Sequence, residues 1–324
     1  MKYSQSLPPG LDLDAASRLI GKELTGGELI AGGKSNLTYR VSGPEGEWVV
    51  RRPPLGHVLS TAHDMGREFR VISALGPTNV PVPGAIALSE DPSFYVMEFV
   101  PGPVYRTAEA LGTLGPRRVQ MLMSNLVDVL VELHSIDPAS VGLTDFGRPD
   151  GYLERQLRRW QKQFESSRSR TIDGIEQLHD LLVARLPASS KSSIVHGDYR
   201  IDNCISSEED TIAAVLDWEM ATLGDPLTDV GLLLMYWRLH IEDVALPPGA
   251  PTGAELAQQY AEKRGLDLAE LDWYLAFANY KLAVIAEGIY FRYQAGQTVG
   301  EGFADMGALV PRLIVQGHDA LRGQ

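Results

Sequence analysis

The chain has 324 residues, of which 44% are hydrophobic and 22% are charged, which is typical of a globular protein large enough for two packed lobes. Its 42 acidic and 29 basic residues give a net charge of −13, which argues against nucleic acid or an anionic membrane as the main partner. The single cysteine, Cys204, excludes an internal disulfide framework and indicates a reducing compartment.

The sequence also lacks the usual signals for a membrane. Residues 1–14 contain no apolar run of signal-peptide length. The long apolar stretch at 275–291 is interrupted by Asn279, Lys281 and Glu287, which indicates a buried helix rather than a membrane span. We therefore expect a cytoplasmic protein.

The first hundred residues predict a β-sheet with one inserted helix. A short helix is expected over 12–24, and β-type runs at 24–43 and 47–54 flank glycine-rich loops. Apolar residues at helical spacing predict the inserted helix over 61–75. Two further strand-like runs, at 80–88 and 93–100, lead to a Pro-Gly-Pro segment at 101–103.

Beyond residue 103 the pattern becomes helical. Helices are predicted at 115–135, 152–168 and 174–186, a strand-like run follows at 192–199, and the chain after about residue 226 is again mostly helical. The sequence therefore predicts an α+β protein with a small β-rich N-terminal lobe over 1–102 and a larger, mainly helical C-terminal lobe over 103–324.

The segment HGDYRIDN at 196–203, followed by LDWE at 216–219, is the strongest chemical signal. A strand that ends in His-Gly-Asp presents Asp198 in a loop, where it can accept a proton from a substrate hydroxyl. Asn203 offers a neutral oxygen and Asp217 a carboxylate, and these are ligands that Mg²⁺ prefers.

These two motifs resemble those of the aminoglycoside phosphotransferase and choline kinase superfamily, in particular the branch with kinase-like domains fused to acyl-CoA dehydrogenases. The resemblance extends from Gly32 to the C-terminal helices. It implies a two-lobed protein-kinase-like fold, with an antiparallel sheet and one helix in the nucleotide-binding N-lobe. It also implies Asp198 as the base, Asn203 and Asp217 as magnesium ligands, and ATP or another nucleoside triphosphate as the donor. We therefore expect an ATP- and magnesium-dependent phosphotransferase that moves the γ-phosphoryl group to a hydroxyl of a small molecule.

The N-terminal lobe offers several candidate nucleotide contacts. In kinases a strand lysine pairs with a helix glutamate and holds the phosphates, and the matching residues here are Arg51 and Glu68. Strand alternation favours Arg51 over its neighbour Arg52, and an arginine keeps the charge and can grip phosphate in bidentate fashion. Backbone amides of a glycine-rich loop could face the triphosphate. That loop comprises Gly32, Gly33, Lys34, Ser35 and Asn36. The loop is not a P-loop, because Glu28 stands where the first glycine belongs and a strand follows. Met97, Glu98 and Val100 would form the hinge that contacts the base.

Three residues and one tripeptide are expected to be structural. His196 should order the catalytic loop by hydrogen bonding, and Asp229 should tie the following helix to that loop. Cys204 should be a small buried residue on a strand. The tripeptide Asp145-Phe146-Gly147 spells the protein-kinase metal motif but precedes His-Gly-Asp, so we assign it to a loop.

The segment 154–170 indicates the class of acceptor. In related enzymes this region lies near the acceptor cleft, and here it carries six basic residues against two acidic ones. Such a helix would repel an aminoglycoside and attract an anionic hydroxy acid or hydroxyacyl compound, and the acyl-CoA dehydrogenase association points the same way. A solvated basic helix face is the alternative. Candidate acceptor contacts are Tyr199, Arg200, Asp202, Glu219, Arg158 and Arg159.

Other functions remain open from the sequence. They are an aminoglycoside or other antibiotic kinase, a metallophosphoesterase, and a non-catalytic pseudokinase-like nucleotide-binding module. The seven histidines form no metal-binding cluster, and no base or metal residue is missing. The sequence decides neither between ATP and GTP nor whether the C-terminal helices bury a homodimer interface.

Overall fold

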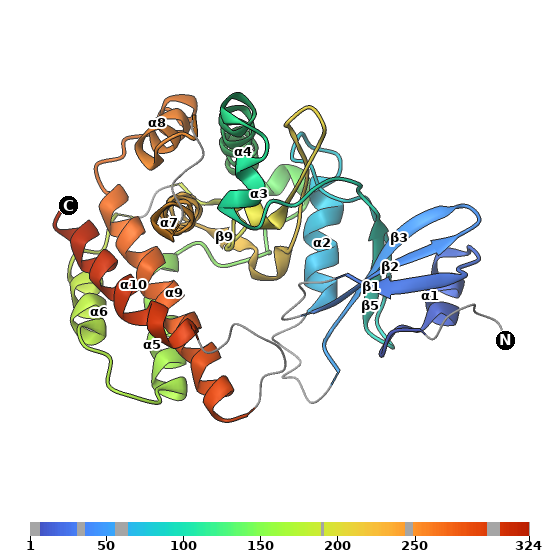
Figure 1. Cartoon of the computed structure of the whole chain (residues 1–324), viewed down its shortest axis with the longest axis horizontal. Helices are drawn as coiled ribbons and strands as arrows, with labels where there is room; N and C mark the ends of the chain where they lie inside the picture. The colour runs from blue at the N-terminus through green and yellow to red at the C-terminus, as the bar shows by residue number, and fades with distance from the viewer. Residues whose placement is uncertain are drawn as a thin grey trace. The chain divides into compact units, whose positions relative to one another are not determined.

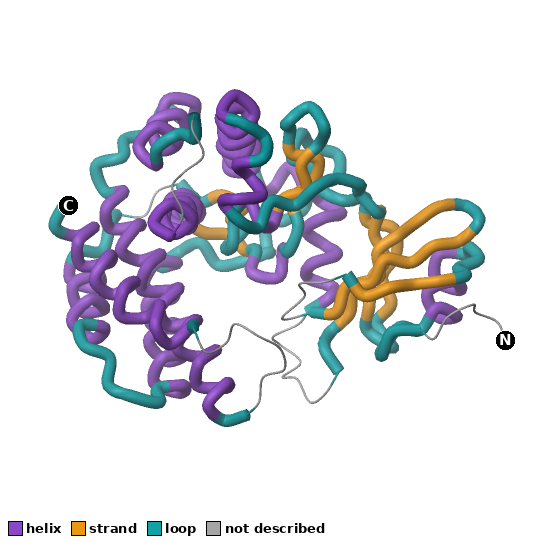
Figure 2. Tube along the Cα trace, in the orientation of Figure 1, coloured by secondary structure: helices purple, strands orange, loops and turns teal. Residues whose placement is uncertain are grey.

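The structure is a computed structural model that describes residues 7–30, 36–55, 64–188, 191–243, 249–296 and 305–323. The chain divides into two compact units. The first unit comprises residues 1–105, 141–143 and 201–221, and the second comprises 106–140, 144–200 and 222–324. Figure 2 shows that most of the β-strands belong to the first unit and that the second unit is mainly helical. A single boundary at residue 102 would place 201–221 with the helices, whereas their contacts place them with the N-terminal residues.

The first unit is built on a five-stranded antiparallel sheet in the order β1-β2-β3-β5-β4 (Figure 1). The strands are β1 (Gly26–Leu29), β2 (Leu37–Gly43), β3 (Gly46–Arg52), β4 (Ala85–Ser89) and β5 (Phe94–Glu98). A tight turn joins β2 to β3, where Gly43 pairs with Gly46. Because Gly43 approaches the backbone of Glu23, an added Cβ would lie 1.9 Å from its carbonyl oxygen. This sheet confirms the antiparallel arrangement that the sequence predicts.

The two faces of the sheet have different partners. Tyr39, Val41 and Val50 pack into a core with Leu13 and Ala16 of helix α1 (Leu13–Ile20). Each large apolar side chain in such a core contributes about 1.5–3 kcal/mol. Helix α2 (Met65–Leu75) contacts β4 and β5, and Arg51 of β3 pairs with Glu68 of α2. The helices expected over 12–24 and 61–75 are present but shorter, because α1 ends at the left-handed Gly21 and α2 begins after the capping Asp64.

A short hairpin completes the first unit. It consists of β7 (Cys204–Ser206) and β8 (Ile212–Val215), flanked by 3₁₀ turns η2 (Ile201–Asn203) and η3 (Trp218–Met220). The N–H of Val215 donates to the carbonyl of Pro81 at 2.8 Å, which ties the hairpin to the segment before β4. Gly102 has φ of 146°, and a Cβ there would lie 2.3 Å from the Ser206 carbonyl oxygen. Glycine at 102 therefore permits a close backbone approach. Cys204 is fully buried on β7, as predicted.

The second unit is mainly helical and surrounds a long central helix, α9. The helices are α3 (Ala108–Gly112), α4 (Pro116–Ser135), α5 (Tyr152–Ser167), α6 (Ile175–Ala184), α7 (Leu227–Asp243), α8 (Gly253–Arg264), α9 (Leu271–Gln294) and α10 (Met306–Leu321). A further 3₁₀ turn, η1 (Pro138–Val141), follows α4, and β6 (Ser193–Val195) pairs with β9 (Thr222–Gly224). Helix α9 contacts α5, α6, α7 and α10, and it runs beside α10 in Figure 1. The helices predicted over 115–135, 152–168 and 174–186 correspond to α4, α5 and α6, which confirms them.

Helix α9 explains the interrupted apolar stretch at 275–291. Asn279, Lys281 and Glu287 are all buried within the unit, and Arg170 and Ser169 both donate to the carboxylate of Glu287. The prediction of a buried helix is therefore confirmed. Among the described residues, no helix is both long and apolar enough to cross a bilayer.

Candidate functional site

Arg51 on β3 and Glu68 on α2 form a nearly buried ion pair in the first unit. The Nε of Arg51 donates to Oε2 of Glu68 at 2.8 Å, and the two side chains are 10% and 3% exposed. The Tyr95 hydroxyl donates to the same oxygen at 3.0 Å, and the Asn36 amide donates to Oε1 at 2.9 Å. Both carboxylate oxygens of Glu68 are therefore hydrogen-bonded, as a buried charge requires.

The guanidinium of Arg51 also reaches a second carboxylate. Its Nη2 donates to Oδ1 of Asp217 at 2.5 Å, and its Nη1 donates to the Thr38 hydroxyl at 3.2 Å. Burial opposes the charge on Arg51, but the carboxylates of Glu68 and Asp217 outweigh it and raise the pKa of Arg51 above its ordinary value. Burial raises the pKa of Glu68, while the nearby Arg51 opposes that rise. The planar fork of arginine allows one residue to bridge both acids, which a lysine could not do in the same way.

The hairpin places the two predicted metal ligands at neighbouring strand ends. Cys204 pairs with Val215, and the N–H of Leu216 donates to the carbonyl of Asn203 at 2.8 Å. Asn203 therefore ends the turn that enters the hairpin, and Asp217 follows the strand that leaves it. Asp217 has φ of 65° and ψ of 60°, a left-handed conformation that is uncommon outside glycine. Strained residues of this kind concentrate at functional sites.

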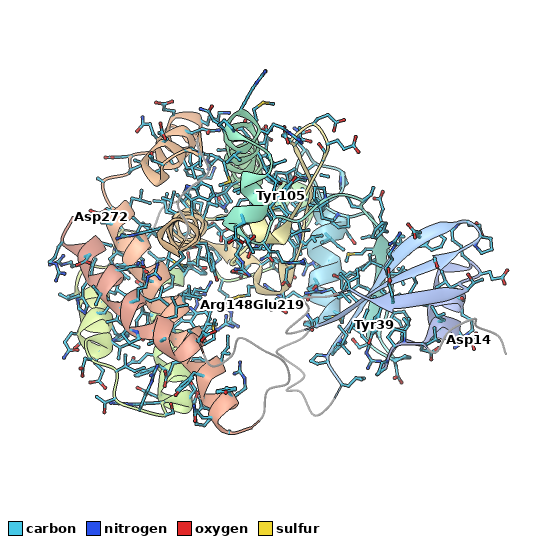
Figure 3. All side chains as sticks on the ribbon, in the orientation of Figure 1. Asp14, Tyr39, Tyr105, Arg148, Glu219 and Asp272 are labelled. Atoms are coloured by element: carbon cyan, nitrogen blue, oxygen red, sulfur yellow. The ribbon has the colours of Figure 1, made fainter. Side chains whose placement is uncertain are left out.

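A group of carboxylates in the first unit fits a hard cation. Within the described part of the chain, Glu68, Asp217 and Glu219 form one group whose ligand oxygens all lie within 4.8 Å of one another. Glu68 is buried and both of its oxygens already accept hydrogen bonds, whereas Asp217 and Glu219 are only half-buried, so these two are the better candidates. Carboxylate oxygens suit Mg²⁺, which favours oxygen ligands. The sequence assigned Glu219, labelled in Figure 3, to the acceptor, whereas the structure groups it with these acids.

The glycine-rich loop is described only at its last residue. The other four predicted contacts lie outside the described residues; they are Gly32, Gly33, Lys34 and Ser35. Asn36 is 1% exposed, and its amide nitrogen donates to Glu68 and, at 3.1 Å, to Oε2 of Glu219. Asn36 therefore contacts the carboxylate group through its side chain.

The predicted hinge residues lie at the end of β5. Met97 is buried in the sheet, where β5 pairs with both β3 and β4. The carboxylate of Glu98 accepts the N–H of Gly84 at 3.2 Å, and Val100 follows the strand in a half-buried position. Their contact with a base stays a prediction.

In the second unit, Asp229 at the start of α7 organises the turn that carries Asp198. Its carboxylate accepts the N–H groups of His196 and Gly197, at 2.6 and 2.8 Å. The Nδ1 of His196 accepts the N–H of Asp198 at 3.2 Å. The structural roles predicted for Asp229 and His196 are therefore confirmed. Asp145-Phe146-Gly147 lies in a loop, also as predicted.

His134 on α4 belongs to this network, although the sequence did not indicate it. Its Nε2 lies 3.3 Å from Oδ2 of Asp229, and its Nδ1 lies 2.8 Å from the Tyr260 hydroxyl. Because a carboxylate only accepts, Nε2 carries the proton and Nδ1 accepts from Tyr260. Burial lowers the pKa of His134. Burial opposes ionisation of Asp229, but the hydrogen bonds and charges of His134 and His196 together outweigh it and lower the pKa of Asp229.

The predicted acceptor contacts differ in their surroundings, and one of them has a structural role. Tyr199 is fully buried, and its hydroxyl donates to the carbonyl of Leu126 on α4 at 2.7 Å, which is a structural role. The Nε of Arg200 lies 3.7 Å from Oδ2 of Asp198, and its guanidinium lies 4.6 Å from the centre of the Tyr236 ring. Asp202 is half-buried in the turn before the hairpin.

Much of the basic segment 154–170 has partners within the second unit. Arg168 pairs with Glu176 at 2.9 Å and Arg170 with Glu287 at 3.0 Å. Arg155 donates to two backbone carbonyls of the preceding loop. Arg158 and Arg159 are exposed, with the Arg159 guanidinium 5.3 Å from the ring centre of Trp160. Three of the six basic residues therefore stabilise the unit itself.

The fold and these residues define a two-lobed, protein-kinase-like phosphotransferase architecture, and comparisons with known proteins agree. The sequence profile of the phosphotransferase enzyme family matches residues 26–274. A solved structure from Ralstonia eutropha, provisionally assigned as an aminoglycoside phosphotransferase, is 32% identical with a TM-score of 0.83, and the match covers 96% of this chain and 97% of that one. The chain belongs to the phosphotransferase enzyme family.

Two mammalian relatives are also similar. Acyl-CoA dehydrogenase family member 10 of Mus musculus is 35% identical over 282 residues, which cover 82% of this chain and 26% of the relative. Acyl-CoA dehydrogenase family member 11 of Rattus norvegicus is 35% identical over 289 residues, which cover 83% of this chain and 37% of the relative. The chain therefore spans well under half the length of these relatives.

Proposed function

We propose that this protein is an ATP- and magnesium-dependent kinase that transfers the γ-phosphoryl group to a hydroxyl of a small molecule. The observation that carries the proposal is the bridge from the buried Glu68 through Arg51 to the half-buried Asp217. This bridge supplies a fixed cation beside carboxylates that suit a metal, which is the combination that phosphoryl transfer needs. Membership of the phosphotransferase family supports the same chemistry.

Each residue has a distinct role in the proposed reaction. Asp217, with Glu219 and the amide oxygen of Asn203, would hold Mg²⁺, and Arg51 would steady the phosphates. Bound magnesium would neutralise charge on the β- and γ-phosphates. Asp198 would orient the acceptor hydroxyl and accept its proton as the oxygen bonds to the γ-phosphorus. The bond to the β–γ bridging oxygen then breaks, and ADP leaves. Most of the acceleration would come from position and electrostatics.

We further infer that the acceptor is anionic, such as a hydroxy acid or a hydroxyacyl compound. Within the second unit, Asp198 has Arg200 at 3.7 Å, and Lys281 is close enough to interact with it electrostatically. Exposed Arg158 and Arg159 add positive charge on α5. An anionic acceptor would be attracted to these cations, whereas a polycationic one would be repelled. The names of the two mammalian relatives are consistent with an acyl compound.

The test is turnover of MgATP across hydroxylated acceptors: hydroxy acids, hydroxyacyl thioesters, sugars, choline and aminoglycosides. We expect ADP formation with the anionic compounds. Asp198→Asn should then lower kcat by about 10²–10⁴-fold, as expected for loss of a general base, with nucleotide affinity unchanged. Asp150→Asn, at an exposed position in the loop before α5, is the matched control and should keep full activity.

Aminoglycoside phosphorylation is the second candidate, because the Ralstonia eutropha structure carries that provisional assignment. Turnover with aminoglycosides alone would retain the kinase chemistry and contradict the anionic acceptor. Tight nucleotide binding without turnover of any acceptor would contradict the kinase proposal and favour a nucleotide sensor.

A further inference from the structure

We propose that Lys281 is a positioning residue for Asp198. Its ammonium group fixes the peptide immediately before that aspartate. This inference rests on the proposed role of Asp198 as the base. Lys281 lies on α9, 83 residues after Asp198 in the chain. Its Nζ donates to the carbonyl of Gly197 at 2.6 Å.

The surroundings of Lys281 are unusual for a lysine. The residue is 6% exposed, and its Nζ lies 5.5 Å from the centre of the Trp160 ring on α5. Lysines are almost never fully buried unless they are paired. Burying an ammonium group costs free energy, and the hydrogen bond to the Gly197 carbonyl offsets part of that cost. A buried charge held at this position indicates a role beside Asp198.

With Lys281 in place, the backbone N–H groups of residues 196–198 and the Gly197 carbonyl all have hydrogen-bond partners. The peptide between Gly197 and Asp198 has its carbonyl bound by Lys281 and its N–H bound by His196. The two preceding N–H groups are bound by Asp229. Gly197 has φ of 83°, so the turn adopts a conformation that most residues avoid. Lys281 supplies the carbonyl contact from α9, and its loss should let this one peptide rotate while the other anchors remain.

The charges that face Lys281 make its protonation state sensitive to Asp198. Burial lowers the pKa of Lys281 to about 8, while the carboxylates of Asp198 and Asp229 oppose that shift and Arg159 adds to it. Lys281 therefore loses its charge as the pH rises through about 8. A neutral amine can still donate to the Gly197 carbonyl, but the bond weakens because it is no longer charge-assisted.

As the pH rises through about 8, the free energy of unfolding should increase while the kcat falls. The unfolded chain binds the lysine proton more tightly, so the contribution of Lys281 to the free energy of unfolding rises between about pH 8 and its ordinary pKa of 10.5. A fall in kcat above pH 8 would therefore not be explained by unfolding through Lys281.

The first experiment compares Lys281→Met, which keeps the length but removes the donor, with Lys281→Arg, which stays charged. We expect Lys281→Met to lower kcat on the order of tenfold to a hundredfold with the KM for ATP unchanged, as for a misplaced base. The kcat of the wild type should fall through about pH 8, whereas Lys281→Arg should recover part of the activity and lose that alkaline limb. Lys191→Met, at an exposed position before β6, is the control and should match the wild type.

The second experiment needs no turnover and so separates this inference from the proposed function. The side-chain NMR signal of Lys281, assigned by its absence in Lys281→Met, should titrate near pH 8. Asp198→Asn should lower that midpoint, because the Asp198 carboxylate raises it. A midpoint near 10.5, or one that ignores Asp198→Asn, would overturn the placement of Lys281 against Asp198. An unchanged kcat and pH profile in an active Lys281→Met variant would overturn its positioning role. Failure of the wild type to turn over any acceptor, with the NMR coupling intact, would count against the proposed function alone.

Discussion

Arg51 lies between two carboxylates, the nearly buried Glu68 and the half-buried Asp217. Its Nε and Nη2 bind Glu68 and Asp217, and the pKa of Glu68 is raised by burial and, to a smaller extent, by the nearby Asp217. The lysine–glutamate pair of kinases pointed to Arg51 and Glu68, and strand alternation, a local property of the sequence, favoured Arg51 over Arg52. Tyr95 carries no sequence signal that separates it from ordinary core residues. Asn36 was expected to face the triphosphate through its backbone, and its side-chain contact with Glu68 was not predicted.

Replacement of Arg51 by methionine should therefore be costly. Glu68 would remain buried without its cation, so we expect the free energy of unfolding to fall by about 3–5 kcal/mol near pH 7. The pKa of Glu68, already raised by burial, would rise further without Arg51. The folded state would then hold the proton more tightly than the unfolded chain, and stability should fall as the pH rises above the ordinary value of 4.5. Urea unfolding at pH 5 and pH 7 measures both effects.

Two variants control for this result. Arg40→Met removes a more exposed arginine, paired with Glu47 on the same sheet, and should cost much less than Arg51→Met. Glu68→Gln in the Arg51→Met background should recover part of the loss. Equal losses for Arg40→Met and Arg51→Met, or no recovery in the double variant, would show that Arg51 does not compensate a buried acid.

Among the elements, helix α7 links the Asp198 turn to the helical unit. Asp229, in its first turn, binds two backbone N–H groups of the turn and the imidazole of His134 on α4. The sequence predicted the first connection, since an aspartate at a helix start often binds a neighbouring backbone. It could not predict the second, because His134 on an amphipathic helix looks the same as any satisfied core histidine.

The variant Asp229→Asn tests this connection. An amide offers one acceptor oxygen, so at least one of the three donors loses its partner, at a cost of about 1–3 kcal/mol for each. The pKa of Asp229 is lowered in the folded state, so its contribution is present above the ordinary value of 3.8 and is lost as the pH falls through the lowered value. The stability gap between wild type and variant should therefore narrow in acid, as measured by denaturant unfolding from pH 7 downward.

Asp225→Asn is the matched control at the start of the same helix. Asp225 accepts the Leu227 N–H and the Tyr274 hydroxyl, and a hydroxyl can reverse its direction while an N–H cannot. The control should therefore cost less than Asp229→Asn. A larger loss in the control, or a gap that widens in acid, would contradict the assigned role of Asp229.

At the level of the whole molecule, local patterns predicted the elements better than their grouping. The helices at 116–135, 152–167 and 175–184 follow from apolar periodicity, and the sheet follows from alternation and turns. Residues 201–221 were predicted to carry metal ligands but not to belong to the first unit. Long-range contacts, such as the hydrogen bond from Val215 to Pro81, produce no pattern in the local sequence. Tyr199 illustrates the same limit of sequence analysis. Its position next to Asp198 suggested a contact with substrate, whereas its hydroxyl binds the backbone of α4 and has a structural role.

Ligand binding should also be visible in the stability of the whole protein. A ligand that binds only the folded state stabilises it, by about 2.7 kcal/mol at a hundred times its Kd. We therefore expect ATP with Mg²⁺ to raise the Tm of the wild type more than ATP alone. Asp217→Asn should remove this dependence on Mg²⁺, because a neutral amide is a weaker magnesium ligand than a carboxylate. Glu209→Gln, on the exposed tip of the same hairpin, should keep it. Equal Tm shifts with and without Mg²⁺ in the wild type would contradict the magnesium site, and an unaltered magnesium dependence in Asp217→Asn would remove Asp217 from it.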